Sequence, residues 1–221
     1  MTLFASQPPR FIAHRGFTPA APENTLAAFT AAGERAFWAI ETDVRRTRDG
    51  ILVCCHDPVT KDGRRVSEHS FADLGLPTFA DYLAICQRYH AVPFLECKED
   101  IVPDILAAVE QAGMLDNAVF SAINFAHIEE CRRLNRRIFV HHIFSTRECM
   151  LRIAALGNGG LSYNYPDPGN APPELLAETK GRGVRICLRA ADNAQQLRIM
   201  QNLELDYIPT NKLWPACPEI A

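Results

Sequence analysis

The sequence of 221 residues lacks the patterns that mark several classes of protein. It has no apolar run near the roughly 18 residues needed to cross a bilayer. Its start, from Met1 to Arg10, shows no basic-then-apolar signal pattern. The formal charge of −3 provides no excess of positive charge that would attract nucleic acid or an acidic membrane. We therefore expect a cytoplasmic protein with no integral membrane segment and no nucleic-acid partner.

Ligand patterns built on cysteine and glycine are absent as well. The 8 cysteines include no C-x-x-C pair, which argues against a zinc site, and a reducing compartment disfavours disulfides. No G-x-G-x-x-G follows the first expected strand, which weakens a dinucleotide-binding interpretation. The chain is 48% hydrophobic and 22% charged, which allows a substantial core. We expect most cysteines to be small buried hydrophobes within a single domain over residues 1–221.

Short apolar runs alternate with amphipathic helical segments along most of the chain. Eight runs are typical of strands that begin a βα unit, starting near residues 11, 38, 92, 118, 138, 161, 184 and 207. Repeated βα alternation predicts a parallel sheet, and eight units at this length predict a closed (β/α)8 barrel, an α/β fold. An open doubly wound sheet is the alternative architecture.

A hairpin is expected after the second barrel strand. The Asp49-Gly50 turn separates that strand from an extended run over residues 51–55, a strong hairpin signal. Residues 58–77 are polar and irregular and are predicted to be a loop. Because the hairpin folds back, it would place His56 beside the end of the second strand.

The end of the second strand carries two carboxylates on one face. Alternate side chains of a strand point the same way, so Glu41 and Asp43 should lie side by side. Two such carboxylates repel each other and resist burial unless a cation lies between them. Oxygen ligands of this kind suit a hard divalent ion such as Mg²⁺ or Ca²⁺. The alternative is a solvated polar strand tip.

Further reactive side chains fall at the ends of neighbouring strands. In a (β/α)8 barrel the active site lies at the C-terminal ends of the strands. His14 and Arg15 follow the first strand, and Glu96 and Lys98 end the third. With His56 delivered by the hairpin, these groups should share one mouth of the barrel with the two carboxylates. Solvated charges scattered at random would not select strand ends.

Five motifs in this region resemble those of a known family. Over residues 11–98 their order and residue types are similar to those of the glycerophosphodiester phosphodiesterase family, which is related to phosphatidylinositol-specific phospholipase C. The motifs are His14-Arg15-Gly16, Pro22-Glu23-Asn24-Thr25, Glu41-Thr42-Asp43, His56-Asp57-Pro58 and Leu95-Glu96-Cys97-Lys98. Beyond residue 98 the likeness is chiefly the βα rhythm.

The resemblance implies one divalent cation, Mg²⁺ or Ca²⁺, bound by Glu41, Asp43 and Glu96. Arg15 and Lys98 would hold the phosphate, although Lys98 alternatively only neutralises Glu96. These roles suit the chemistry. A phosphodiester is anionic and resists attack, so cationic groups and a divalent ion must offset the charge that develops in the transition state.

The resemblance also implies that His14 and His56 form the general acid–base pair, with either histidine in either role. Glu23 and Asn24 would support the metal site, or they simply cap the following helix. The remaining histidines are expected to be ordinary hydrogen-bonded polar groups: His69, His90, His127, His141 and His142.

The expected activity is hydrolysis of a glycerophosphodiester, a small-molecule substrate, to glycerol 3-phosphate and an alcohol. The alternatives are a relative acting on a lysophospholipid, an opine-sugar or a cyclic inositol phosphodiester, and a barrel that binds phosphodiesters without turnover.

The chain departs from the family pattern at two strand ends. The family usually has a tryptophan on strand seven, whereas the corresponding stretch of this chain, Val184 to Arg189, has no aromatic residue, and the closing strand often ends in Thr-Asp, where this chain has Asn211. Arg185 and Arg189 lie on the same strand face and are expected to face outward, because barrel interiors are mostly apolar; facing inward, they could instead reach a second anionic group on the substrate. Losing the aromatic predicts a preference for a bulkier or more acidic leaving group.

Overall fold

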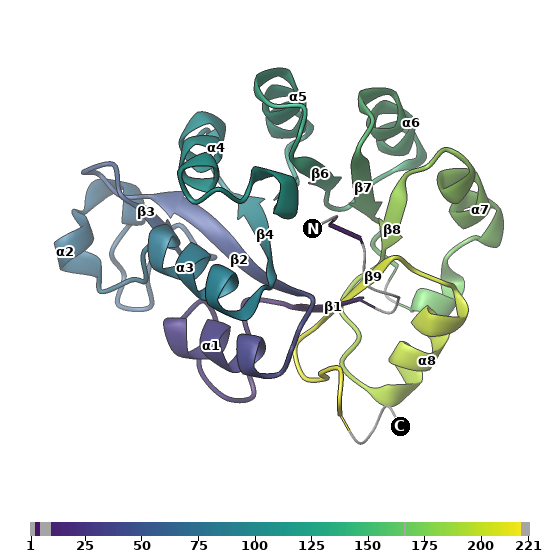
Figure 1. The fold of residues 1–221 in the computed structure, drawn as a ribbon, viewed down its shortest axis with the longest axis horizontal. Coiled ribbons are helices and arrows are strands. Elements are labelled where there is room, and N and C mark those ends of the chain that lie inside the picture. Colours follow the sequence, from purple (N-terminus) through teal and green to yellow (C-terminus); the bar gives the residue numbers. More distant parts are fainter. Residues whose placement is uncertain (1–2, 5–9, 166, 218–221) are drawn as a thin grey trace.

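A computed structural model describes residues 3–4, 10–165 and 167–217. Helices surround a ring of strands in this part of the chain (Figure 1). The strands are β1 (Arg10–Ala13), β2 (Ala39–Arg46), β3 (Leu52–Cys54), β4 (Val92–Cys97), β5 (Val119–Ala122), β6 (Phe139–His142), β7 (Gly159–Ser162), β8 (Arg185–Cys187) and β9 (Tyr207–Thr210). The α-helices are α1 (Leu26–Glu34), α2 (Phe71–Leu74), α3 (Phe79–Tyr89), α4 (Val102–Gln111), α5 (Phe125–Leu134), α6 (Arg147–Leu156), α7 (Pro173–Gly181) and α8 (Ala194–Asn202).

The strand order is β8-β7-β6-β5-β4-β2-β1-β9, and every neighbouring pair on this path is parallel. Strand β3 lies off the path and pairs antiparallel with β2, as the hairpin prediction required. The seam between β8 and β9 is joined by Asp206: its N–H donates to the Ile186 carbonyl at 3.0 Å, and its Oδ2 accepts from the Ile186 N–H at 2.8 Å. The (β/α)8 barrel is therefore confirmed over the open sheet.

Both faces of the barrel wall are buried, as expected for parallel strands. One apolar layer fills the space between strands and helices, and a smaller one fills the barrel itself. Phe4 packs into the inner layer, where its ring lies 5.6 Å from that of Trp38 and 5.0 Å from that of Phe139. Six of the eight cysteines are buried, and all eight are free, as predicted.

Two boundaries differ from the sequence prediction. The predicted loop over residues 58–77 contains a 3₁₀ turn (Val66–Glu68) and α2. The apolar pattern predicts a strand over Leu161–Tyr165, but β7 begins earlier, at Gly159. Its glycines give no hydrophobic signal, yet one is required by packing: a Cβ on Gly160 would lie 2.3 Å from the Tyr207 hydroxyl oxygen.

The outward orientation expected for Arg185 and Arg189 is wrong. Arg185 shares its face with Cys187 of the inner layer, and its guanidinium donates to Asp206 Oδ1 at 2.6 Å and lies 4.7 Å from the centroid of the Phe4 ring. Arg189 lines the cavity described below. Arg185 is tolerated on this face because its side chain remains 44% exposed and forms an ion pair with Asp206.

Most of the segment Met1–Arg10, on which the absence of a signal pattern was judged, lies outside the described residues. Within the part that the structure describes, no helix is both long and apolar enough to cross a membrane.

A buried histidine under the barrel mouth makes stability depend on pH. His141 is 2% exposed, its Nδ1 lies 2.7 Å from the Tyr207 hydroxyl, and burial lowers the pKa of His141 from 6.5 to about 3. The unfolded chain therefore binds this proton more tightly, and stability falls as the pH drops from about 6.5 toward 3. Between pH 7 and pH 5 we expect a loss of about 2 kcal/mol from this residue.

Urea unfolding of wild type and His141→Gln at the two pH values measures this loss, because glutamine retains a partner for Tyr207. The variant should lose about 2 kcal/mol less than wild type. His69→Gln, at a partly exposed histidine, is the matched control. Equal losses in wild type and His141→Gln would contradict the prediction.

Candidate active site

A cavity of about 560 Å³ opens at the C-terminal ends of the strands. It is lined by six of the residues that the sequence singled out: His14, Arg15, Glu41, His56, Glu96 and Lys98. The hairpin brings His56 to this mouth as predicted, since Cys55 N–H donates to the Asp43 carbonyl at 2.9 Å. The barrel thus gathers groups from β1, β2, β4 and the β3 hairpin into one site.

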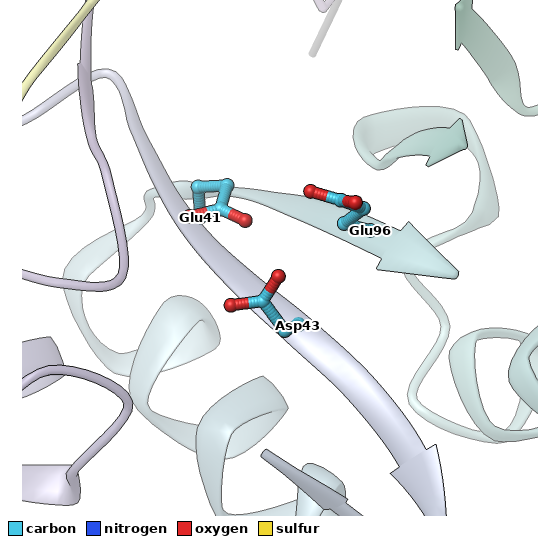
Figure 2. A group of neighbouring side chains, drawn as sticks. All are labelled: Glu41, Asp43 and Glu96. Atoms are coloured by element: carbon cyan, nitrogen blue, oxygen red, sulfur yellow. The ribbon is translucent and has the colours of Figure 1, made fainter. Parts of the chain in front are cut away.

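Three carboxylates converge at the base of this mouth. Figure 2 shows Glu41 and Asp43 on β2 and Glu96 on β4 turned toward one another. Asp43 and Glu96 are partners in the β2–β4 register, and one oxygen from each of the three carboxylates lies within 4.8 Å of the others. Asp43 is fully buried and Glu41 is 5% exposed, so these are not solvated strand tips.

Asn24 holds Asp43 in place. Its side-chain N–H donates to Asp43 Oδ2 at 2.9 Å, and its Oδ1 accepts from the Thr42 hydroxyl at 2.8 Å. Asn24 is buried and has a φ of +54°, in the left-handed region that asparagine tolerates better than most residues. The N-cap of α1 is Thr25, so Asn24 is bonded to the carboxylate cluster and does not cap the helix. Glu23 instead receives a hydrogen bond from Arg15 at 3.1 Å.

Two cations face the three carboxylates. Arg15 donates its backbone N–H to Glu41 Oε2 at 2.7 Å, and its guanidinium Nε lies 3.5 Å from Asp43 Oδ2. Lys98 Nζ donates to Glu96 at 2.6 Å and lies 3.1 Å from Asp43 Oδ1. Burial alone would lower the pKa of Lys98, but the Asp43 and Glu96 carboxylates raise it above its ordinary value. Lys98 is therefore charged at neutral pH.

The donor set fits a hard divalent cation. Burial, and then the neighbouring Asp43 and Glu96 carboxylates, raise the pKa of Glu41 well above its ordinary value. Asp43 Oδ1 is buried without a well-aligned hydrogen bond from any described residue. Three carboxylates that each offer an oxygen within reach of one ion, one of them with a raised pKa in the absence of a cation, suit Mg²⁺ or Ca²⁺.

The two histidines differ in their surroundings. His14 is largely buried, its Nδ1 lies 2.7 Å from Asn211 Oδ1, and burial lowers its pKa. His56 is more exposed, and its Nδ1 lies 2.8 Å from the exposed Asp57 carboxylate. Hydrogen bonding to His56 lowers the pKa of Asp57. The ionised Asp57 carboxylate therefore lies next to the His56 imidazole.

Sequence reasoning missed several residues of the cavity. Asp192 lies in the loop after β8 and binds Asn211, and no motif points to it. The cavity rim includes Ile123 and Phe144, which are 48% and 54% exposed. Each comes one or two residues after a barrel strand, and that position is the only signal that could have found them.

Comparison with known proteins points to one family. A sequence model of the glycerophosphoryl diester phosphodiesterase family matches residues 14–78. A glycerophosphodiester phosphodiesterase of Caldanaerobacter subterraneus subsp. tengcongensis is 25% identical over 90% of this chain and 93% of its own length.

Solved structures share the fold at lower identity. A putative glycerophosphoryl diester phosphodiesterase from Silicibacter pomeroyi superposes with a TM-score of 0.82 at 22% identity, over 92% of this chain and 90% of that chain. A phosphodiesterase from Oleispira antarctica, solved in complex with the product sn-glycerol-3-phosphate, gives 0.80 at 22% identity, over 92% and 93% of the two chains. The resemblance seen in the sequence is confirmed: the matching family model and the similar curated protein both describe glycerophosphodiester phosphodiesterases, and the solved structures share the barrel fold.

Proposed function

We propose that residues 1–221 form a single catalytic domain, a metal-dependent phosphodiesterase that hydrolyses a glycerophosphodiester to glycerol 3-phosphate and an alcohol. The observation that carries this proposal is the convergence of a buried three-carboxylate cluster, two cations and two histidines at one barrel mouth. Each component answers one difficulty of the reaction: the charge on the phosphate, proton removal from the attacking hydroxyl, and protonation of the leaving alcohol. The similar proteins support it, since one is named a glycerophosphodiester phosphodiesterase and another is a phosphodiesterase solved with the product sn-glycerol-3-phosphate.

Arg15 and Lys98 would bind the phosphate and hold its phosphorus within the cavity. Glu41, Asp43 and Glu96 would hold a divalent cation, which supplies Lewis-acid stabilisation of charge on the phosphate. Both Arg15 and Lys98 already touch the carboxylate cluster, so the charge balance of the site changes little when an anionic substrate enters with the cation.

The histidine environments support a division of labour. His14, whose pKa burial lowers, is neutral at pH 7 and would accept a proton from the nucleophile, which is either water itself or a glycerol hydroxyl whose cyclic phosphate product water then opens. His56, paired with Asp57, would donate a proton to the leaving alkoxide, so that one proton enters and one leaves in each turnover. The more exposed His56 lies where an alcohol product must depart.

The test is direct. Purified protein with Mg²⁺ or Ca²⁺ should release glycerol 3-phosphate from at least one of glycerophosphocholine, glycerophosphoethanolamine and glycerophosphoinositol. Tight binding of these compounds without turnover would instead establish the non-catalytic alternative. The intact set of histidines and carboxylates argues against that alternative.

A lysophospholipid is a second candidate substrate, because one side of the cavity is apolar. Ile123, Ile143 and Phe144 line it. Phe144 has a φ of +59°, a conformation that strains a bulky residue, and its ring is half exposed. The acyl chain of a lysophospholipid, which is attached to its glycerol and stays on the acylglycerol 3-phosphate product, would cover this ring, which water otherwise contacts.

Phe144→Ala should therefore separate the two substrate classes. Losing half the contact area of a phenylalanine costs about 1 kcal/mol, roughly a fivefold fall in kcat/KM for a lysophospholipid. Glycerophosphocholine, which has no acyl chain, should change by less than about twofold. The exposed Leu134→Ala at the far end of α5 is the matched control. An equal fall for both substrates would contradict apolar recognition by Phe144.

A further inference from the structure

Asp192 contacts no residue to which the family motifs assign a role. It is nevertheless linked to the proposed catalytic residue His14 through the side chain of Asn211. Asn211 Nδ2 donates to both carboxylate oxygens of Asp192, at 3.1 and 2.9 Å, and the Asn211 backbone N–H donates to Asp192 Oδ1 at 2.9 Å. The other end of the same amide, Oδ1, lies 2.7 Å from His14 Nδ1.

The chain builds this arrangement from three loops. The Ala191 N–H donates to the Pro209 carbonyl at 2.8 Å, which fastens the loop after β8 to the closing strand β9. The Asp192 N–H donates to Gln196 Oε1 at 3.0 Å at the start of α8. On the other side, the His14 N–H donates to the Thr210 carbonyl at 3.1 Å. Asp192, Asn211 and His14 are thus held by backbone bonds on each of their elements.

The chemistry of the three groups fixes the direction of every hydrogen bond. An ionised carboxylate only accepts, so Asp192 requires the NH₂ end of the Asn211 amide to face it. The amide oxygen must then face His14, and because that oxygen also only accepts, His14 Nδ1 must carry the hydrogen. In the neutral imidazole the lone pair is then left on Nε2, the nitrogen able to take a proton in the cavity that His14 lines.

We propose that Asp192 is a positioning residue: by clamping the Asn211 amide, it fixes the tautomer and the orientation of His14. This inference rests on the proposed function for its catalytic consequence, but the clamp itself is a property of the protein alone. Without Asp192 the amide can turn over and present its NH₂ group to Nδ1, which selects the tautomer whose Nε2 carries a hydrogen and cannot act as a base.

The tautomer can be observed without substrate. In ¹⁵N-labelled protein at pH 8, imidazole nitrogen shifts should show His14 with Nδ1 protonated and Nε2 bare; a His14→Gln spectrum identifies the signals. Asp192→Ala should give a mixture of both tautomers, and the control Asp116→Asn, an exposed partner of Arg137, should match wild type. An unchanged His14 tautomer in Asp192→Ala would overturn the proposal.

The second test of the proposal measures turnover. Asp192→Ala should lower kcat by at least about 10-fold, part of the usual contribution of a general base, with KM within about threefold. The exchanged pair Asp192→Asn with Asn211→Asp restores an acceptor for Nδ1 and a donor for that acceptor, so it should be more active than either single variant. An exchanged pair no better than the singles, whether or not Asp192→Ala folds, would overturn the proposal. If wild type itself turns over none of the diesters, the proposed function fails while the tautomer measurement still decides the clamp.

Discussion

Exhaustive chelation is expected to abolish turnover, and Mg²⁺ or Ca²⁺ to restore it. The reason is the carboxylate cluster: Glu41 and Asp43 are buried, and Glu96 completes three ligands within 4.8 Å of one another. Lys98 and Arg15 offset part of this charge, but in the proposed function they would also have to bind the anionic substrate. Without a divalent ion, one site cannot both neutralise its own carboxylates and stabilise the transition state.

Metal binding can be measured apart from activity. A cation that binds only the folded state raises stability by RT ln(1 + [L]/Kd), about 2.7 kcal/mol at a hundredfold excess over Kd. Titrating Mg²⁺ or Ca²⁺ into metal-free wild type should therefore raise the Tm.

Glu41→Gln tests the same cluster from the protein side. It replaces a buried carboxyl group whose pKa is raised by burial and by the neighbouring carboxylates. The metal-free variant should therefore be at least as stable as metal-free wild type. It should nevertheless lose most of the metal-dependent rise in Tm and at least ~10²-fold in kcat/KM. Glu34→Gln, exposed on α1, is the control. Full activity after chelation, with no metal found in the protein, would refute the assignment.

The sequence predicted the features that local chemistry determines. The βα rhythm predicted the barrel, and the Asp49-Gly50 turn predicted the hairpin that carries His56. Residues at strand ends were predicted to meet because a parallel barrel brings all such ends to one mouth. Glu41 and Glu96 agree with this prediction, because they lie on β2 and β4, which are paired neighbours in the barrel.

Features that depend on loops or on contacts distant in sequence could not be predicted. The Asp192–Asn211 contact joins two loops whose approach is set by the β8–β9 seam. The inward Arg185 depends on Asp206, a residue of the following unit that also closes the barrel. Strand β7 begins at Gly159-Gly160, where a Cβ would collide with Ile153 or with Tyr207, and glycine has a low strand propensity, so the apolar pattern gave no sign of this start.

Replacing either proposed catalytic histidine should cost at least ~10²-fold in kcat, the usual contribution of a general acid or base. His14→Ala removes the proposed proton acceptor, and His56→Ala removes the proposed donor. Neither histidine belongs to the carboxylate cluster, so both variants should keep the rise in Tm with Mg²⁺ or Ca²⁺. His69→Ala is the matched control, because the His69 imidazole Nδ1 lies 2.9 Å from the Arg65 carbonyl oxygen, outside the cavity lining.

The pH profile distinguishes the two roles. Wild-type kcat/KM should show a bell-shaped dependence on pH, because the general base must be neutral and the general acid must be protonated. Burial lowers the pKa of His14 from 6.5, so the acidic limb, where the base becomes protonated, should lie below that value. A leaving group of low pKa, such as 4-nitrophenol, needs little protonation. On a nitrophenyl diester His56→Ala should therefore recover most of its activity and lose the alkaline limb, while His14→Ala stays impaired. Recovery by His14→Ala in place of His56→Ala would reverse the assignment, and full activity of both variants on natural diesters would refute the pair.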